Sequence, residues 1–512
     1  MSAGRAPFSF APALQLMGGR LVGFAATFFV PIVLVRVFEP ELFGTYKQLF
    51  LVYTTLFSLA QIGMAESLFY FLPQRPEKSG RLLVNSFLML ALSGAAALAF
   101  LWLFDSRIAA WLSNPEVAGH LPWIGLYLLL MLASAGLEIA LLCRRRYLGA
   151  TASYALSDIL RAVFLVVPTL VFGDLRWLLA GAVVFAAGRL GIFLALLGQG
   201  YRGSLRPDRG LLARQLAYSL PFQAAVVVEV AQVSLHQYAV AYWFDAATFA
   251  IYAVGCLQIP LVEFAASSAG NVLMVGMGGA LKEGDREGAR EIWAGTTRKL
   301  ALLLAPATVV LLVAGPDLIP FLFTERYAAS VPIFMVWTVA VILGAVQTDA
   351  ALRTYAEVRF LLVMNLVRLA LIAGSIYWAV SALGLVGAVA VTVAGTLVAK
   401  GLALGRLRRC LGTGWAGVLP WGDLARITGV SVAAALPPAL LWPGLERGTF
   451  ATLAILGTTY AAALALLVWR LRILTPGETA AAGRLARRTL RLAPRRIGAR
   501  PPGPQPSEPE VT

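Results

Sequence analysis

Six basic side chains lie inside long apolar segments of the chain, where charged groups are rarely found. They are Arg20, Arg36, Arg161, Arg189, Arg368 and Lys400. Each Arg or Lys near the centre of a bilayer costs about 2.5–3.5 kcal/mol, so such residues normally face a water-filled cavity or an acidic partner. Arg36 stands at the end of its segment, and we expect its side chain to reach the membrane interface. The other five are candidate anion-binding residues, because a guanidinium group can donate two parallel hydrogen bonds to phosphate oxygens.

Four of these residues form two pairs at a nearly constant separation. Arg161 and Arg368 lie 207 residues apart, and Arg189 and Lys400 lie 211 apart. If two halves of the chain face each other, the pairs would surround one central vestibule. The alternative is that each cation bonds to a nearby acid. Asp158 precedes Arg161 by three positions, which suits an ion pair within one helix.

Acidic residues within the apolar segments have two possible roles. Asp158 of the first half corresponds to Asn365 in the second half, so Arg368 lacks an acid at this spacing. Glu66, Glu138, Glu229 and Glu263 are further candidate partners for the cations. A carboxylate in a low dielectric can also bind a proton or Na⁺ in one state and an arginine in another. Of the four, Glu66, Glu229 and Glu263 are therefore candidates for ion coupling as well as for permanent pairing.

The sequence contains no pattern typical of an enzyme, and we predict neither catalytic residues nor a cofactor. It has no GxxxxGK[ST] phosphate loop and no GxSxG nucleophile turn. The two histidines, His120 and His236, cannot form an HExxH site, and the three cysteines have no metal-ligand spacing. We therefore expect no metal centre.

Composition indicates a membrane protein. The chain is 59% hydrophobic and 13% charged, which excludes an ordinary soluble domain. The formal net charge of +16 would suggest nucleic acid as the partner of a soluble protein. Here the basic residues cluster between apolar segments and in the tail, so the predicted partners are anionic phospholipid headgroups and no nucleic acid.

The apolar segments predict an all-α polytopic protein with fourteen transmembrane helices. They cover about 13–37, 48–72, 82–104, 121–143, 148–172, 177–199, 215–243, 246–281, 300–323, 330–350, 360–380, 383–405, 427–443 and 450–469. One side of this topology collects 31 Lys and Arg residues and the other five: Lys47, Arg107, Arg176, Arg326 and Arg447. The positive-inside rule then predicts both termini in the cytoplasm. No cleavable signal peptide is visible.

An internal repeat predicts how these helices are grouped. The pattern at 38–46 (FEPELFGTY) returns 206 residues later at 244–252 (FDAATFAIY). Six helices separate equivalent points, so the two halves have the same orientation. We predict an N-lobe at 1–205, a C-lobe at 206–410, a central cavity between them, a helix pair at 411–470 and a basic, Pro-rich cytoplasmic tail at 471–512. The segment Leu281–Lys299 is predicted to form an amphipathic surface helix.

This arrangement resembles the multidrug/oligosaccharidyl-lipid/polysaccharide exporter superfamily. The segments 38–46, 63–68, 71–73 and 323–327 resemble those of Wzx-type polysaccharide flippases, and the resemblance covers about residues 10–410. It implies a transporter of the bacterial inner membrane that moves a polyprenyl-diphosphate-linked oligosaccharide outward for surface polysaccharide biosynthesis, such as O-antigen or exopolysaccharide. A polymerase and glycosyltransferases are further candidate partners.

Three alternatives remain open at this point. A cation-coupled drug antiporter of the same superfamily would favour an acidic chamber, and the first helix here carries Arg20 and Arg36 but no acid. A flippase for a peptidoglycan-precursor lipid would differ only in the glycan that it carries. A membrane scaffold that recruits glycosyltransferases through its tail would not depend on the cations inside the helices. The sequence does not indicate the glycan, the coupling ion or the oligomeric state.

Overall fold

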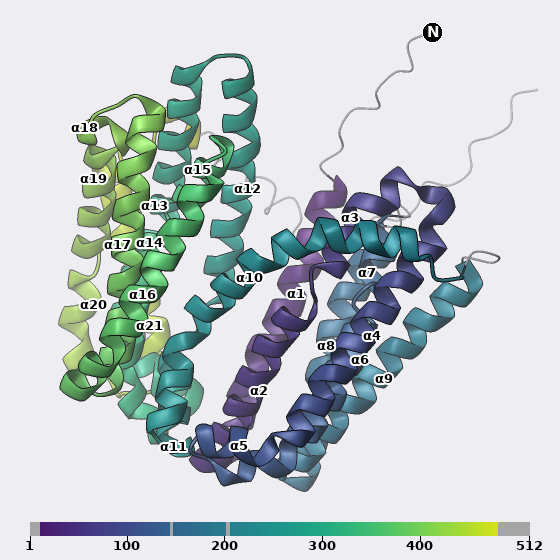
Figure 1. Cartoon of the computed structure of the whole chain (residues 1–512). Helices are drawn as coiled ribbons and strands as arrows, with labels where there is room; N and C mark the ends of the chain where they lie inside the picture. Colours follow the sequence, from purple (N-terminus) through teal and green to yellow (C-terminus); the bar gives the residue numbers. More distant parts are fainter. Residues whose placement is uncertain (1–10, 144–146, 201–204, 480–512) are drawn as a thin grey trace, which may run out of the picture.

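The computed structural model describes residues 11–143, 147–200 and 205–479; the side chains of residues 11–22 and of a few further positions are outside this description. The described part is all-α and contains no strand (Figure 1). Among the described residues, thirteen helices are long and apolar enough to cross a membrane, and Gly23–Leu34 in the first helix is a shorter apolar segment. The all-α, polytopic fold class is thus confirmed.

The N-lobe contains helices α1 to α9. Their bounds are α1 Ala11–Leu34, α2 Pro40–Ala60, α3 Met64–Gln74, α4 Ser79–Leu103, α5 Asp105–Trp111, α6 Leu121–Ala133, α7 Leu137–Cys143, α8 Tyr147–Phe172 and α9 Leu175–Gly200. Helix α1 packs along α8, α4 packs along α6, and α9 packs against both α6 and α8.

The C-lobe and the last helices follow the same order. Their bounds are α10 Arg209–Trp243, α11 Ala246–Gly255, α12 Pro260–Lys282, α13 Arg286–Phe323, α14 Val331–Leu343, α15 Thr348–Thr354, α16 Val358–Leu383, α17 Leu385–Leu411, α18 Trp415–Val418, α19 Trp421–Ala433, α20 Leu436–Leu441 and α21 Phe450–Arg470. Helices α10 and α16, α13 and α14, and α14 and α17 repeat the packing of the N-lobe.

The second and fourth transmembrane segments of each lobe are broken into two helices. In the N-lobe the breaks separate α2 from α3 and α6 from α7; in the C-lobe they separate α11 from α12 and α14 from α15. Gly63, at the first break, has φ +62°, a left-handed conformation that glycine adopts without strain. The expectation of one continuous helix over 246–281 was therefore wrong. Apolar composition continues across each break, so hydrophobicity alone does not reveal it.

Two other predicted boundaries also differ. The second segment begins at Pro40 rather than at 48, because proline is well accommodated in the first turn of a helix. The stretch 281–299 forms no separate surface helix: Asp285 caps α13, which continues to Phe323. The first turns of α13 remain amphipathic, with Ala289 and Trp293 buried.

Helix α10 crosses from one lobe to the other (Figure 1). In its first half, Gln215 donates to Ser86 of α4 at 3.0 Å, and Gln223 donates to the Ser58 carbonyl of α2 at 2.9 Å. In its second half, Gln232 donates to the Asn365 carbonyl of α16. One helix therefore links the polar interiors of both lobes.

The lobes meet at the end of the molecule where α5 and α11 lie, which we call the lower end (Figure 1). The Arg36 guanidinium donates to the carbonyls of Phe321 and Leu322, at 2.9 and 2.7 Å, where α13 ends. Arg326 of the C-lobe pairs with Glu39 of the N-lobe at 2.6 Å. The exposed Arg36 side chain, at the end of its segment, thus also joins the two lobes.

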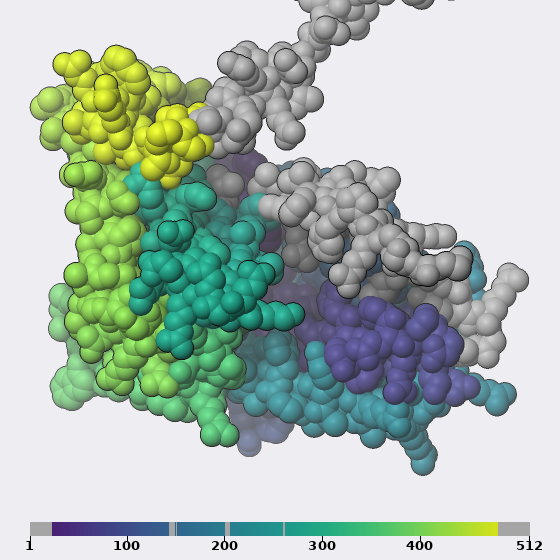
Figure 2. Space-filling view, turned by 90° about the horizontal axis from the view of Figure 1, so that it is seen from above, coloured from purple at the N-terminus to yellow at the C-terminus, as the bar shows by residue number. Residues whose placement is uncertain are grey.

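Close backbone contact reinforces this joint between the lobes. A Cβ atom added at Gly44 of α2 would lie 1.8 Å from the Ala246 carbonyl oxygen of α11, so only glycine fits there. At the opposite, upper end, the surface is hollowed between the teal α12–α13 segment and the purple N-lobe (Figure 2). The molecule is therefore closed at one end and more open at the other.

The last helices form a separate layer on α13. At the lower end, the fully buried Asp317 accepts hydrogen bonds from the Trp442 indole at 2.6 Å and from the Gly448 N–H at 2.9 Å. At the upper end, Arg298 pairs with Asp423 at 2.6 Å and with Glu478 at 3.2 Å. Both ends of α13 are thus attached to this layer, outside the repeat. The Arg-rich stretch 483–488 lies outside the described residues.

Candidate functional site

A cavity of about 770 Å³ lies between the two lobes. Its lining comes from α1, α2, α10, α11 and α12, the first helices of each lobe. Both aromatic rings and polar groups line it: Phe24, Phe28, Phe50 and Phe249, and Thr27, Thr54, Ser58, Ser234, Gln237 and Gln258. Such a mixture of flat apolar faces and hydrogen-bonding groups can hold a polar organic molecule of moderate size.

Three charged residues line this central cavity: Lys47, Glu229 and Glu263. Lys47 lies on α2, and its ammonium group is 5.4 Å from the Phe43 ring centre and 5.8 Å from that of Tyr46. Within the described structure, this amine has no hydrogen-bond or ion-pair partner. It is therefore available to an anion in the cavity.

Sequence reasoning missed Lys47 and assigned it to an external loop. The cause was the late predicted start of the second helix, which excluded the polar turn from Pro40 onward. The Pro40-Glu41 pair could have indicated the true start, since proline and acidic residues are both favoured in the first turn of a helix.

The three candidate coupling acids occupy different places. Glu229 of α10 and Glu263 of α12 line the central cavity, and both side chains are exposed to it rather than buried. Glu66 is exposed near the start of α3 and lines neither of the two cavities found in the described structure. No ion pair joins Glu229 or Glu263 to a cation among the described residues. Two of the three acids thus share one cavity with Lys47.

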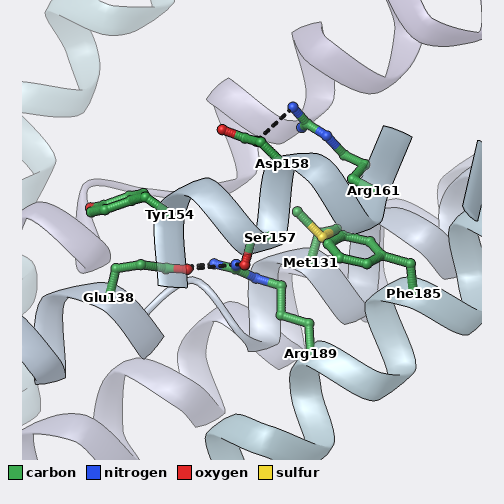
Figure 3. A pocket seen from close by; sticks show the side chains of 8 residues that line it. All are labelled: Met131, Glu138, Tyr154, Ser157, Asp158, Arg161, Phe185 and Arg189. Carbon is green, nitrogen blue, oxygen red and sulfur yellow. Dashed lines mark hydrogen bonds and ion pairs between the residues drawn. The ribbon is translucent and has the colours of Figure 1, made fainter. Parts of the chain in front are cut away.

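A second, smaller cavity of about 160 Å³ lies inside the N-lobe (Figure 3). Arg189 of α9 pairs with Glu138 of α7, both guanidinium nitrogens lying 2.6 Å from the carboxylate oxygens. Ser157 accepts a further hydrogen bond from Arg189 at 2.8 Å. The Arg189 and Glu138 side chains are only 11% and 4% exposed. This bidentate pair occupies the guanidinium fully, so the acid-partner alternative applies to Arg189.

Arg161 also lines the small cavity but reaches the wall of the central one. It pairs with Asp158 at 2.9 Å (Figure 3), as the spacing of three residues suggested. It also donates to the Thr27 hydroxyl at 3.0 Å. Thr27 itself lines the central cavity. A Cβ atom added at Gly23 of α1 would lie 2.3 Å from an Asp158 oxygen, so α1 packs closely over this pair. The Thr27 hydroxyl thus lies between Arg161 and the cavity between the lobes.

The corresponding cations of the C-lobe have different surroundings. Lys400 of α17 donates to the Val346 carbonyl at 2.6 Å and approaches the Thr348 hydroxyl at 3.4 Å, across the break between α14 and α15. Arg189 spans the equivalent break, since it also contacts Ser134 at 3.2 Å. Both cations therefore satisfy polar groups that a helix break leaves open.

Arg368 of α16 has no hydrogen bond or ion pair within the described structure, and its Nε atom is buried without a partner. Arg20 lies in a part of α1 whose side chains are outside the described residues. The structure thus brings Arg161 and Arg189 together in one cavity. Arg368 and Lys400 line neither of the two cavities.

Residues 33–332 match the family of polysaccharide biosynthesis proteins. The chain belongs to this family. The match begins in the last turn of α1 and ends at the start of α14, so it includes all the lining of the central cavity from Lys47 to Glu263. A comparison with curated protein sequences gives no match.

Solved structures of transporters share the fold. The inward-closed conformation of the lipid II flippase MurJ gives a TM-score of 0.66 at 13% identity, covering 90% of this chain and 98% of that one. An inward-facing multidrug transporter of the MATE family, within the MOP superfamily, gives 0.57 at 16% identity, covering 77% and 98%. A MOP superfamily transporter from Pyrococcus furiosus gives 0.55 at 14%, covering 78% and 95%. The resemblance to this superfamily is confirmed at the level of fold.

Proposed function

We propose that this protein moves a polyprenyl-diphosphate-linked oligosaccharide across the bacterial inner membrane for surface polysaccharide biosynthesis, with no chemical conversion of its substrate. The observation that carries the proposal is the central cavity of about 770 Å³ between the two lobes, in a chain of the polysaccharide biosynthesis family. Transport sites between repeated lobes serve alternating access, in which rocking of the lobes opens first one end and then the other.

The lining of the central cavity suits such a headgroup. Pockets of about 300–1,000 Å³ hold molecules of drug size, so this cavity would admit a diphosphate with a few sugars but no polymer. Lys47 is the unpartnered cation that would hold the phosphates. Gln237, Gln258 and Ser234 offer hydrogen bonds to sugar hydroxyls, and the phenyl rings offer flat faces.

The candidate residues from the sequence fit this scheme to different degrees. Arg161 stands behind Thr27 and would gain access to substrate by a short movement. Arg189 and Lys400 are bound at helix breaks and would act by shaping their lobes. Glu229 and Glu263 would bind the coupling proton or Na⁺. Arg20, Glu66 and the coupling role as a whole remain predictions.

The orientation of the protein also remains a proposal. The charge bias assigns the upper end, and with it both termini, to the cytoplasm. The hollow of Figure 2 would then admit substrate from the inner leaflet. Anionic phospholipids would contact the basic loops and tail, and a polymerase and glycosyltransferases would act before and after transport.

The test is glycan export in a strain that lacks the native gene. Lys47→Ala should reduce export about tenfold or more, since a charge-assisted hydrogen bond contributes about 1.5–3 kcal/mol. Lys47→Arg should retain much of it. Lys282→Ala, which removes an exposed lysine at the end of α12, is the matched control. Normal export by Lys47→Ala, at normal membrane levels, would contradict the assigned role of Lys47.

A second function is favoured by one observation. The central cavity carries two carboxylates and one amine, and an acidic chamber suits export of a cationic compound. Loss of Glu229 should then abolish resistance to cationic drugs while glycan export continues. Sensitivity assays on Glu229→Gln cells, run beside the glycan assay, separate the two functions.

A further inference from the structure

The two lobes can be compared position by position in their interiors. In the N-lobe, Asp158 and Arg161 are three residues apart on α8 and form an ion pair at 2.9 Å. The equivalent positions on α16, 207 residues later, are Asn365 and Arg368. One acid of the N-lobe has thus become a neutral amide. The basic residue has been kept.

The other charges do not compensate for this change. Glu138 and Arg189 in the N-lobe correspond to Asp349 and Lys400 in the C-lobe, each 211 residues later. The N-lobe set therefore contains two acids and two bases, whereas the C-lobe set contains one acid and two bases. Asp349 accepts a hydrogen bond from Thr348 at 3.1 Å and forms no ion pair within the described chain. The interior of the C-lobe has an uncompensated positive charge.

Arg368 forms no ion pair or hydrogen bond within the described chain. Its Nε atom is buried without a hydrogen bond, and its neighbours across the helix interfaces are His236 on α10, Asp349 on α15 and Lys400 on α17. Ser234 occupies the position equivalent to Thr27, 207 residues later, and it also lines the central cavity. Arg368 thus belongs behind the C-lobe wall of the cavity, as Arg161 does behind the N-lobe wall.

We propose that Arg368 is the phosphate-binding residue of the C-lobe wall. Arg161 does not bind phosphate in the same way, because Asp158 already neutralises it. Arg368 is half-buried, with its Nε atom enclosed and unbonded. A cation inside an apolar span without a partner is unfavourable, and such a group is retained where an anion completes it in another state. The planar guanidinium suits a phosphate group. The proposal deepens the proposed function and rests on it for the identity of the phosphate, which would be the diphosphate of the lipid-linked substrate.

The experiment uses the repeat by giving each lobe the residue that the other lobe has at the position of Asp158 and Asn365. Asn365→Asp recreates in the C-lobe the acid that pairs with arginine in the N-lobe, at almost no change in shape. Asp158→Asn does the reverse. Binding of inorganic pyrophosphate and of farnesyl diphosphate is measured by calorimetry on the purified full chain in detergent, together with Arg368→Lys, Arg368→Ala and Arg161→Ala.

We expect Asn365→Asp and Arg368→Ala each to weaken diphosphate binding by about tenfold or more, since a charge-assisted contact is lost. Arg368→Lys should keep part of the affinity, and Arg161→Ala should change it less than about threefold. The double variant Asn365→Asp/Arg368→Ala should bind more weakly than either single one, because its carboxylate then has no arginine to neutralise it and repels the diphosphate. If Arg368→Ala does not fold, Asn365→Asp still gives the answer.

Three results would overturn the proposal. Binding by Asn365→Asp equal to that of the unaltered chain would show that Arg368 does not meet the anion. An equal loss with Arg161→Ala would remove the asymmetry between the lobes. Displacement of pyrophosphate by chloride at similar concentration would make the site one for small inorganic anions.

The same assay distinguishes two possible sources of the phosphate, a lipid-linked headgroup and a free phosphate compound. Tighter binding of farnesyl diphosphate than of pyrophosphate supports a lipid-linked headgroup, and equal binding makes a free phosphate compound the ligand and contradicts the lipid-linked assignment. Because binding is measured without transport, failure of the proposed function is distinguishable: the export assay with Lys47 variants would then fail while the Arg368 site still binds diphosphate.

Discussion

The interiors of the two lobes share their helix order and their two helix breaks, yet they stabilise the breaks differently. In the N-lobe, Arg189 spans the α6–α7 break and is neutralised by Glu138 at 2.6 Å. In the C-lobe, Lys400 spans the α14–α15 break and bonds to a main-chain carbonyl instead. A duplicated architecture can therefore be preserved while its charges diverge. At this break both lobes keep a cation and an acid at equivalent positions, but Glu138 forms an ion pair whereas Asp349 forms none within the described chain.

This difference suggests a division of labour. The N-lobe has its interior charges paired around a small cavity, so its interior is complete without a ligand. The C-lobe retains a cation that has no partner in the described structure. We infer that the N-lobe moves as a rigid body, whereas the C-lobe carries the part of the site that responds to substrate. Three predictions test this contrast.

The largest effect is expected from tying the lobes together. Glu39 and Arg326 form an ion pair at 2.6 Å between the lobes at the lower end, and both side chains are exposed. In a chain freed of its native cysteines, Glu39→Cys/Arg326→Cys should react with a short bifunctional thiol reagent. Export should then stop, because alternating access requires this end to open.

The matched control is a pair within one lobe. Glu357 and Arg406 pair at 2.7 Å, both in the C-lobe, so Glu357→Cys/Arg406→Cys should crosslink without loss of export. The measurement is glycan at the cell surface before and after the reagent, with crosslinking followed by mass spectrometry. Full export from completely crosslinked Glu39→Cys/Arg326→Cys protein would rule out separation of the lobes at this end.

The next effect compares the two helix breaks. Glu138→Ala leaves the Arg189 guanidinium buried without its counter-charge, which costs about 3–5 kcal/mol when one partner of a buried pair is removed. Lys400→Met removes the cation instead, and the Val346 carbonyl keeps its hydrogen bond from the Thr348 N–H at 3.0 Å, so the loss should be that of one hydrogen bond, about 0.5–1.5 kcal/mol. Thermal unfolding in detergent should therefore show a larger loss for Glu138→Ala. Glu116→Ala, at an exposed position, serves as the control.

If Lys400→Met proves the more damaging variant, the C-lobe break depends on its lysine more than the N-lobe break depends on its ion pair. The assignment of a complete N-lobe and an incomplete C-lobe would then be reversed.

The sequence predicted the helices well and the site only in part, for physical reasons. Length and apolar composition determine where a chain can cross a membrane, so the spans were found. The helix breaks were missed because α6 ends before Ser134 and α11 before Cys256, inside segments that remain apolar overall. Asp158–Arg161 could be anticipated, since both lie on one helix at a spacing of three. Contacts between helices, such as Arg189–Glu138, depend on packing that the spacing does not encode.

The roles of Arg36 and Lys47 illustrate the same limit. Arg36 looked like an interfacial cation, because its partners are carbonyls of α13 some 285 residues away. Lys47 looked like a loop residue, because the helix that carries it begins in a polar stretch. A charge next to an apolar segment can therefore bind the other lobe, as Arg36 does, or line a cavity, as Lys47 does.

The smallest effect concerns the layer of last helices, which lies outside the repeat. Burial tends to raise the pKa of Glu478, but hydrogen bonds from Arg298 and from the Thr475 N–H outweigh it and hold the pKa below the ordinary value of 4.5. A carboxyl group with a lowered pKa stabilises the fold above that ordinary value, and its contribution disappears as the pH falls through the lowered pKa.

Limited proteolysis of the segment after α21 should therefore accelerate as the pH is lowered below about 4.5, with little change between pH 6 and 8. Glu478→Gln should be cleaved faster at neutral pH and should lose part of this acid dependence, since Asp423 still holds Arg298 at 2.6 Å. Glycan export should be unchanged in Glu478→Gln, because this contact lies away from the central cavity. A marked export defect would instead connect the outer layer to the movement of the C-lobe.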